Sequence, residues 1–325
     1  IVKNAKLWNP GAPYLYIMKV IIDGTNLEEP IDEYSIDVGI RTVKVEKTSF
    51  LINGRPFYFK GFGKHEDSEI IGRAYNPSVI KRDFELLKWI NANSFRTSHY
   101  PYSEEILQMA DREGIVIIDE CAAVGLNVMN FSLVEMGSGH VPFFEKDTIN
   151  QTMTVHKSAI EELFRRDKNH PSVCMWSLMN EPDTATEHCP SYFKDIFEYA
   201  KTLDPQNRPL TFASQVTIDK DKCLQFVDVI CLNRYYGWYI LGGGEIDTAM
   251  ELLKKELDTI SSMYKDKPIM FTEFGADTMP GVHKLPASMW SEEYQREYLE
   301  KTFAVFDKYP SLIGEQMWNF ADFQT

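Results

Sequence analysis

The sequence predicts an α/β barrel in which eight parallel strands alternate with helices, the TIM (β/α)8 fold, preceded by part of an all-β domain. Short apolar runs alternate with amphipathic stretches from Phe57 onward, which is the pattern of strands followed by helices. Eight such runs occur, and chemically active polar side chains follow several of them. At 325 residues the chain is long enough for a barrel, which needs about 250 residues, and for a further β segment.

Residues 1–46 have the pattern of β-strands. The alternating sets are Tyr14, Tyr16, Met18 and Val20, followed by Ile36, Val38 and Ile40. Asp23-Gly24 predicts a turn between these sets. About three strands are too few for a stable sandwich, so we expect 1–46 to be the tail of an all-β domain whose first strands lie upstream. Asn53-Gly54, between apolar arms, then predicts a β-hairpin.

The barrel prediction rests on strand candidates separated by helix signals. The strand candidates are Phe57–Phe62, Ser94–Thr97, Ile115–Asp119, Val173–Met179, Leu210–Ala213, Val227–Leu232, Ile269–Thr272 and Leu312–Trp318. Asn76-Pro77 and Ser103 predict helix starts, and Gly114 predicts a helix end. The clearest apolar stripe of a helix is Ile246, Met250, Leu253, Leu257 and Ile260. We expect 47–325 to be a barrel truncated after its eighth strand, since no room remains for a last helix.

Composition excludes several classes of protein. A formal net charge of −14 argues against a nucleic-acid partner, and no apolar run is long enough to span a membrane. The five cysteines have no regular spacing, which favours buried reduced thiols and a reducing compartment such as the cytoplasm. Because the chain begins at Ile1 without an initiator Met, the lack of a signal peptide carries little weight.

Two glutamates follow apolar strand candidates of the same construction. The run Val173–Met179 leads into Asn180, Glu181 and a proline, and Ile269–Thr272 leads into Glu273. Parallel barrels carry their chemistry at the carboxyl ends of their strands, so both side chains are expected on one rim. The alternative for the first site is that Asn180 caps a short helix and Glu181 lies in its first turn.

Other strand candidates also end in polar and aromatic residues. These rim residues include His65, Arg96, His99, Glu120, Asn233, Tyr235, Tyr239 and Trp318. Amides, imidazoles and carboxylates bond hydroxyl groups while aromatic rings take apolar sugar faces, so the rim is typical of a carbohydrate site. Two carboxyl groups flanking a glycosidic bond suffice for its hydrolysis.

Five long stretches carry a resemblance to a known family. They are RTSHYPY from Arg96, RDKNHPSVCMWSLMNEP from Arg166, NRYYGWY from Asn233, TEFGAD from Thr272 and GEQMWNFADF from Gly314. These resemble segments of the β-glucuronidases of glycoside hydrolase family 2, and the resemblance covers all 325 residues. It implies an immunoglobulin-like sandwich for the all-β domain, and a retaining hydrolase that releases glucuronic acid from β-glucuronides.

The resemblance also implies residue roles. Glu181 would be the acid/base and Glu273 the nucleophile, with Asn180 bonded to the sugar 2-hydroxyl. The other implied roles are Tyr235 bonded to the nucleophile, Asn233 and Tyr239 reaching the sugar and its carboxylate, Trp318 at the floor, and His65, Arg96 and His99 lining the pocket. Two alternatives remain open: His99 is a satisfied loop histidine, and Arg96 holds Glu120 or Glu273 instead of touching sugar.

The expected partner is a small-molecule glucuronide or a glucuronide-ended oligosaccharide, and the full-length protein is expected to be a homo-oligomer. No cofactor is expected, and no metal, because Glu120 lacks the following histidine found in related magnesium-binding β-galactosidases. The apolar segment Leu126–Phe144 is expected to cover the aglycone side. An Asn-x-Lys element that grips the glucuronate carboxylate would follow Thr325. A β-galactosidase, a galacturonidase and a non-catalytic sugar-binding barrel therefore remain as alternatives.

Overall fold

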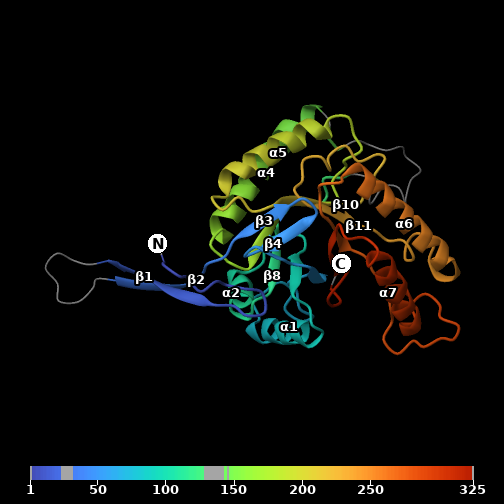
Figure 1. The fold of residues 1–325 in the computed structure, drawn as a ribbon, viewed down its shortest axis with the longest axis horizontal. Helices are drawn as coiled ribbons and strands as arrows, with labels where there is room; N and C mark the ends of the chain where they lie inside the picture. The colour runs from blue at the N-terminus through green and yellow to red at the C-terminus, as the bar shows by residue number, and fades with distance from the viewer. Residues whose placement is uncertain (1, 23–31, 128–142, 145, 324–325) are drawn as a thin grey trace.

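The computed structural model describes residues 2–22, 32–127, 143–144 and 146–323, and its centre is a closed barrel of eight parallel strands (Figure 1). The strands are β6 (Phe59–Lys64), β7 (Ser94–Thr97), β8 (Val116–Glu120), β9 (Val173–Asn180), β10 (Leu210–Ser214), β11 (Ile230–Asn233), β12 (Ile269–Glu273) and β13 (Leu312–Met317). They lie around the barrel in chain order, and β13 pairs with β6 to close it. The predicted TIM barrel is confirmed.

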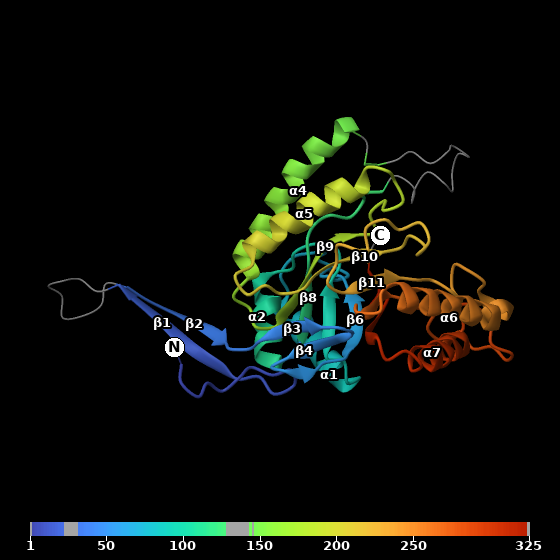
Figure 2. The same cartoon turned by 45° about the horizontal axis from the view of Figure 1, so that its top comes forward.

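Helices cover the outside of this barrel in both views (Figures 1 and 2). They are α1 (Pro77–Trp89), α2 (Glu104–Glu113), α4 (Lys146–Asp167), α5 (Cys189–Leu203), α6 (Ile246–Met263) and α7 (Glu292–Phe306), with a short 3-10 helix η1 (Gly243–Glu245) before α6. The Asn76 side chain caps α1 by accepting a hydrogen bond from the Val79 amide, 3.3 Å away. Gly114 ends α2 in the left-handed conformation, with φ of 71°. The predicted starts, stop and apolar stripe are therefore confirmed.

The connection between β10 and β11 departs from the predicted repeat. Residues 215–229, all of them described, form a loop in place of a helix, and β11 starts at Ile230 instead of Val227. The Asp221 carboxylate organises this loop, since it accepts hydrogen bonds from the Ser214 hydroxyl at 2.6 Å and the Cys223 amide at 2.8 Å. A side chain that bonds the backbone two residues on stabilises a turn in competition with a helix.

Two small antiparallel sheets precede the barrel. Strands β1 (Leu15–Ile22) and β2 (Asp32–Gly39) pair with each other and project away from the barrel (Figures 1 and 2). The predicted Asp23-Gly24 turn lies outside the described residues. Strands β3 (Val43–Glu46), β4 (Ser49–Ile52) and β5 (Arg55–Pro56) form the second sheet. Its β4–β5 hairpin turns at Asn53 and Gly54, both with positive φ, as Asn-Gly predicts. The domain boundary at residue 46 stays a prediction.

Residues that precede the barrel fill its amino-terminal end. Trp8, Phe50 and Ile52 are buried, and they join one apolar cluster with barrel residues. The barrel members of the cluster are Phe59, Val116, Ile118, Cys174, Met175, Val229, Cys231, Met270 and Ile313. The Trp8 indole also donates a hydrogen bond to the Asp111 carbonyl, 2.8 Å away. Because this end is packed with apolar side chains, the open mouth of the barrel is the opposite, carboxyl end.

The remaining composition predictions concern cysteines and membrane spans. All five cysteines are free and buried, as the spacing predicted. In the part of the chain that the structure describes, no helix combines the length and the apolar character needed to cross a membrane.

Gly61, in β6, allows the backbones of β6 and β7 to approach each other closely. A Cβ atom added there would lie 1.8 Å from the Ser94 carbonyl oxygen, which is backbone and cannot move aside. Gly61→Ala is therefore expected to lower the free energy of unfolding by at least about 3 kcal/mol, measured by chemical denaturation. Gly244→Ala is the matched control, because nothing lies within 4 Å of its added Cβ. Equal stability of the two variants would contradict the pairing of these strands.

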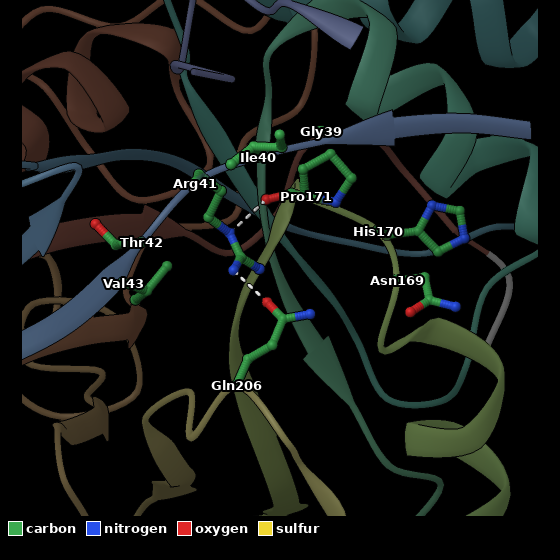
Figure 3. Close-up of a pocket in the computed structure, with 9 residues that line it drawn as sticks. All are labelled: Gly39, Ile40, Arg41, Thr42, Val43, Asn169, His170, Pro171 and Gln206. Atoms are coloured by element: carbon green, nitrogen blue, oxygen red, sulfur yellow. Dashed lines mark hydrogen bonds between the residues drawn. The ribbon is translucent and has the colours of Figure 1, made fainter. Parts of the chain in front are cut away.

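A cavity of about 440 Å³ lies at the amino-terminal end of the barrel, since its lining includes residues just before β9 and β10. Figure 3 shows the residues that line it. Arg41 spans this region. Its guanidinium donates to the Pro171 carbonyl at 3.0 Å, to the Gln206 side chain at 2.5 Å and to the Val173 carbonyl at 2.6 Å. Arg41 thus clamps the segment between β2 and β3 to the barrel. The cavity lies at the end opposite the predicted sugar site.

His170, also in Figure 3, ties this end of the barrel to α2. Its Nδ1 lies 2.6 Å from the Asp111 carboxylate. Burial alone would lower the pKa of His170, but the hydrogen bond to Asp111 and the charge of that carboxylate outweigh it and raise the pKa. The stabilisation of the folded protein by the His170–Asp111 pair is therefore complete below the pKa that His170 has in the unfolded chain, about 6.5. It is lost as pH rises through the higher pKa that His170 has in the folded protein.

His170→Asn is expected to cost about 2 kcal/mol of unfolding free energy near pH 5.5 and less near pH 9, measured by urea denaturation of both proteins. His283→Asn is the control. The His283 imidazole contacts Glu293 at 2.8 Å on the exposed surface, where solvent screens the pair, so its loss should change stability little. A cost for His170→Asn that grows with pH would contradict the assignment.

Candidate active site

The carboxyl end of β9 carries the first predicted glutamate. Asn180 is the last residue of β9, and Glu181 follows it in the left-handed conformation, with φ of 49°. A non-glycine residue there costs about 1–3 kcal/mol, and such strain is one feature of active sites. Helix α5 begins only at Cys189, so the alternative in which Asn180 caps a helix around Glu181 is wrong.

Asn233, at the end of β11, connects this glutamate to its neighbours. Its Nδ2 donates to Glu181 Oε1 at 2.9 Å and to Asn180 Oδ1 at 3.2 Å. Its Oδ1 accepts from the Thr272 hydroxyl at 2.8 Å, which fixes the orientation of the amide. The ends of β9, β11 and β12 are thereby tied together by side chains, as expected for one rim.

Glu273 ends β12 and is almost fully buried. Its Oε1 accepts a hydrogen bond from Arg96 Nη2 at 2.5 Å, and its Oε2 accepts one from the Tyr235 hydroxyl. The backbone amide of Arg234 donates to the Glu273 carbonyl at 2.8 Å, which continues the β11–β12 pairing to this residue. The carboxylate is therefore held in one orientation from two sides.

Arg96 has no exposed surface and bridges two carboxylates. Besides Glu273, its guanidinium contacts both oxygens of Glu120, at 2.9 and 2.8 Å through Nη1. The same Nη1 lies 3.3 Å from Asn180 Oδ1. Of the two sequence alternatives, the structure shows the one in which Arg96 holds carboxylates. A direct contact with sugar stays a prediction.

The environments of the two predicted catalytic carboxyl groups differ. Burial and the charge of Glu273 together raise the pKa of Glu181 to about 7, although the hydrogen bond from Asn233 partly opposes them. Glu273 forms an ion pair with Arg96 instead. Burial and the nearby charges of Glu273 and Glu181 raise the pKa of Tyr235 well above its usual value, so its hydroxyl remains a donor. One carboxyl group is thus suited to donate a proton near neutral pH.

Aromatic rings form the other side of the site. His99 stacks on Trp318, with ring centroids 5.3 Å apart and planes 15° apart, and His65 meets the edge of Trp318 at 5.4 Å. Burial and the neighbouring His99 lower the pKa of His65 to about 4, so this imidazole is neutral. A Cβ on Gly275 would lie 2.5 Å from the Trp318 carbonyl oxygen, so glycine permits this close approach.

The structure thus brings nine of the ten predicted site residues into one connected group through Arg96, Asn233 and Trp318. The tenth, Tyr239, joins the group through its ring, which lies 5.1 Å from that of Tyr235, and it is 68% exposed. All ten predicted site residues therefore belong to this group. The individual roles stay predictions.

Three contributors were not assigned roles from the sequence: Glu120, Ser177 and Thr272. Ser177 and Thr272 were polar residues within otherwise apolar strand candidates, which is the signal that could have identified them. Glu120 stood at a strand end, where rim chemistry is expected.

Within the described ranges there is no cluster of three or more His, Cys, Asp or Glu able to hold a metal ion, and the expectation of a metal-free site stays a prediction. Most of the predicted aglycone segment, residues 128–142, lies outside the described residues.

Comparison with known families now places the chain. Residues 43–325 match the TIM barrel domain of glycosyl hydrolases family 2, and residues 1–41 match a second domain of that family. The chain belongs to glycosyl hydrolase family 2. The resemblance on which the sequence analysis drew is confirmed.

Several relatives of the chain are β-glucuronidases. A β-glucuronidase of Paenibacillus borealis is 48% identical across this whole chain, and one of Mus musculus is 44% identical. The crystal structure of Ruminococcus gnavus β-glucuronidase is 52% identical, with a TM-score of 0.92 over 99% of this chain and 53% of that one. The same enzyme has been solved with uronic isofagomine, also at 52% identity and a TM-score of 0.92. The chain spans about half the length of the curated relatives it matches, 52% and 48% of the two named here.

Proposed function

We propose that the protein is a retaining β-glucuronidase that releases β-D-glucuronic acid by double displacement. The observation that carries the proposal is the pair of unlike carboxyl groups on one rim. Glu181 has its pKa raised to about 7, whereas Glu273 is paired with Arg96 and bonded by Tyr235. A protonated acid beside a paired carboxylate is the arrangement that glycoside hydrolysis needs.

In the first step, Glu273 attacks the anomeric carbon while Glu181 donates its proton to the glycosidic oxygen. The carbon–oxygen bond to the aglycone breaks, its electron pair leaves with the oxygen, and an ester bond forms between the sugar and Glu273. Arg96 and Tyr235 hold both oxygens of Glu273 and thereby fix its line of attack. Asn180 is anchored by Arg96 and Asn233 and would bond the sugar 2-hydroxyl.

In the second step, the now ionised Glu181 takes a proton from water as the oxygen of that water attacks the anomeric carbon. The ester to Glu273 breaks, and glucuronic acid leaves with the β configuration retained. Each carboxyl group returns to its starting protonation state, so no cofactor is required. His65, His99, Trp318 and Tyr239 would complete the sugar cup with polar edges and ring faces.

The substrate class rests on the relatives, which are named β-glucuronidases. We expect a small-molecule glucuronide or a glucuronide-ended oligosaccharide, a homo-oligomer in the full-length protein and no nucleic-acid partner. Five buried free cysteines favour a reducing compartment such as the cytoplasm. The alternatives in substrate class are a β-galactoside and a galacturonide.

The test compares 4-nitrophenyl β-D-glucuronide, β-D-galactoside and β-D-galacturonide as substrates of the intact protein. The expected result is preferred hydrolysis of the glucuronide, with the β anomer of glucuronic acid appearing first in the proton NMR spectrum. Preference for the galactoside or galacturonide would overturn the substrate class. An α anomer as first product would remove Glu273 as nucleophile, and inertness to all three substrates would favour a sugar-binding barrel.

A further inference from the structure

Glu120, at the end of β8, receives hydrogen bonds from three residues on its carboxylate and donates one from its backbone amide, and none of these bonds goes to Glu181 or Glu273. The donors to its carboxylate are Arg96 Nη1 at 2.9 and 2.8 Å, His99 Nδ1 at 2.7 Å and the Ser177 hydroxyl at 2.7 Å. The Thr97 hydroxyl accepts from its backbone amide at 2.8 Å. Glu120 has no exposed surface.

The protonation state of Glu120 decides whether its side chain can donate a hydrogen bond or only accept one. Burial alone would raise the pKa of Glu120, but the charge of Arg96 and the contacts with His99 outweigh it and lower the pKa. An ionised carboxylate only accepts hydrogen bonds. The nitrogen of His99 that lies 2.7 Å from Glu120 Oε1 must therefore carry a proton.

This requirement excludes the neutral form of the His99 ring that carries its proton on Nε2. With its proton on Nδ1, a neutral imidazole exposes the lone pair of Nε2 on its other edge. Nε2 lies 3.8 Å from Glu273 Oε1, on the side of the site where the sugar is expected. His99 Nδ1 also lies 3.1 Å from Arg96 Nη1, but two donors cannot bond each other, so Glu120 is the partner that determines the tautomer.

We propose that Glu120 is a positioning residue for hydrolysis: it fixes Arg96 against Glu273 and locks His99 as the Nδ1–H tautomer, leaving Nε2 free to accept a hydrogen bond from a sugar hydroxyl. The inference rests on the proposed function and deepens it. Arg96 has no exposed surface, so its placement depends on the carboxylates that flank it. Glu120 thereby controls two groups that contact or face the nucleophile, through a carboxylate that never meets substrate.

The first measurement needs no variant. The ring ¹⁵N spectrum of the intact protein, labelled at its seven histidines, should show the Nδ1–H form for His99, assigned by the signal that His99→Gln removes. Because the readout is a chemical shift, it does not depend on turnover. A proton on Nε2 of His99 in the wild type would overturn the inference. Hydrolysis of the glucuronide in the same sample reports separately on the proposed function.

The second measurement uses Glu120→Gln. The amide oxygen can still accept from Arg96, but its NH2 group would donate to His99 Nδ1 and move the ring proton to Nε2. We expect that tautomer change together with an approximately 100-fold lower kcat on the aryl glucuronide, because one neutral oxygen fixes Arg96, and through it Glu273, less firmly than two charged oxygens do. Glu120→Asp, which keeps the charge, should restore the Nδ1–H form and part of kcat.

Glu256→Gln is the matched control, since it also removes a buried carboxylate bonded to an arginine. Glu256 accepts from Arg234 Nε at 3.0 and 2.9 Å and makes no contact with His99 or Glu273 among its described bonds. It is expected to lower stability while leaving kcat and the His99 spectrum unchanged. A Glu120→Gln protein with wild-type kcat would overturn the inference, as would a Glu256→Gln protein with the same tautomer change. If Glu120→Gln does not fold, the wild-type spectrum still decides.

Discussion

Replacing Glu273 with alanine is expected to lower kcat on an aryl β-glucuronide by about 10⁵- to 10⁶-fold, the scale on which removal of a covalent nucleophile acts in other enzymes. The reason is geometric: Arg96 and Tyr235 hold the two oxygens of this carboxylate, and among the described residues no other carboxyl group shares both contacts. Binding of a uronic acid inhibitor, measured by calorimetry, should survive within about tenfold, since the loss concerns a bond formed only during reaction.

Azide should allow the Glu273→Ala variant to form a product. In the space left by the Glu273 carboxylate, azide can attack the anomeric carbon from the same face and expel an activated aryl leaving group. The product is then the α-glucuronyl azide, which proton NMR distinguishes from the β form. Glu315→Gln is the control: this carboxylate also lies on a barrel strand and accepts from the Tyr58 hydroxyl at 3.0 Å, away from the site. A Glu273→Ala protein with more than about 1% of wild-type kcat would exclude the assignment.

Replacing Glu181 with glutamine is expected to remove the basic limb of the pH profile. The rate requires Glu181 in its protonated form, and its pKa of about 7 means that this form is lost as pH rises above about 7. Glutamine does not titrate, so kcat/KM of the variant should be flat there. Glu273, Asn233 and Arg96, which act on the pKa of Glu181, all remain in the variant.

The loss of kcat/KM caused by Glu181→Gln should depend on the leaving group of the substrate. For an alkyl glucuronide, whose alkoxide needs a proton, we expect kcat/KM to fall by about 10²- to 10⁴-fold. For a dinitrophenyl glucuronide, whose phenolate leaves unaided, the fall should be much smaller. Azide added to Glu181→Ala should give the β-glucuronyl azide, opposite to the product of Glu273→Ala, because it attacks the sugar ester on Glu273. An equal loss on both substrates, with the basic limb retained, would assign proton donation to another group.

The strand ends were predictable because local patterns determine them. An apolar run of a few residues that stops at a polar side chain has the same meaning wherever it occurs, and the predicted strand Ile269–Thr272 lies within β12, Ile269–Glu273. The rim position of Glu181 and Glu273 followed from that pattern and from the parallel order of the strands. The loop at residues 215–229 was missed because one carboxylate, Asp221, outweighs helical propensity there.

The contacts that orient the site were not predictable from local pattern. Arg96 reaches Glu120 and Glu273, which are 24 and 177 residues away along the chain, and only closure of the barrel brings them within hydrogen-bond distance. The sequence analysis left open whether Arg96 bonds sugar or carboxylate, since an arginine at a strand end fits both. The filling of the amino-terminal end by Trp8 and Phe50 was equally invisible, because neither residue belongs to the barrel repeat.

That filling has a consequence for protein engineering. A domain graft cut at the first barrel strand, Phe59, would leave Trp8, Phe50 and Ile52 on the discarded side. The interior at that end would then open to water, and the excised unit would collapse or self-associate even with every catalytic residue retained. The transplantable unit therefore starts before Trp8. The polypeptide ahead of the first β/α repeat closes the amino-terminal end of the barrel and keeps water out of its interior.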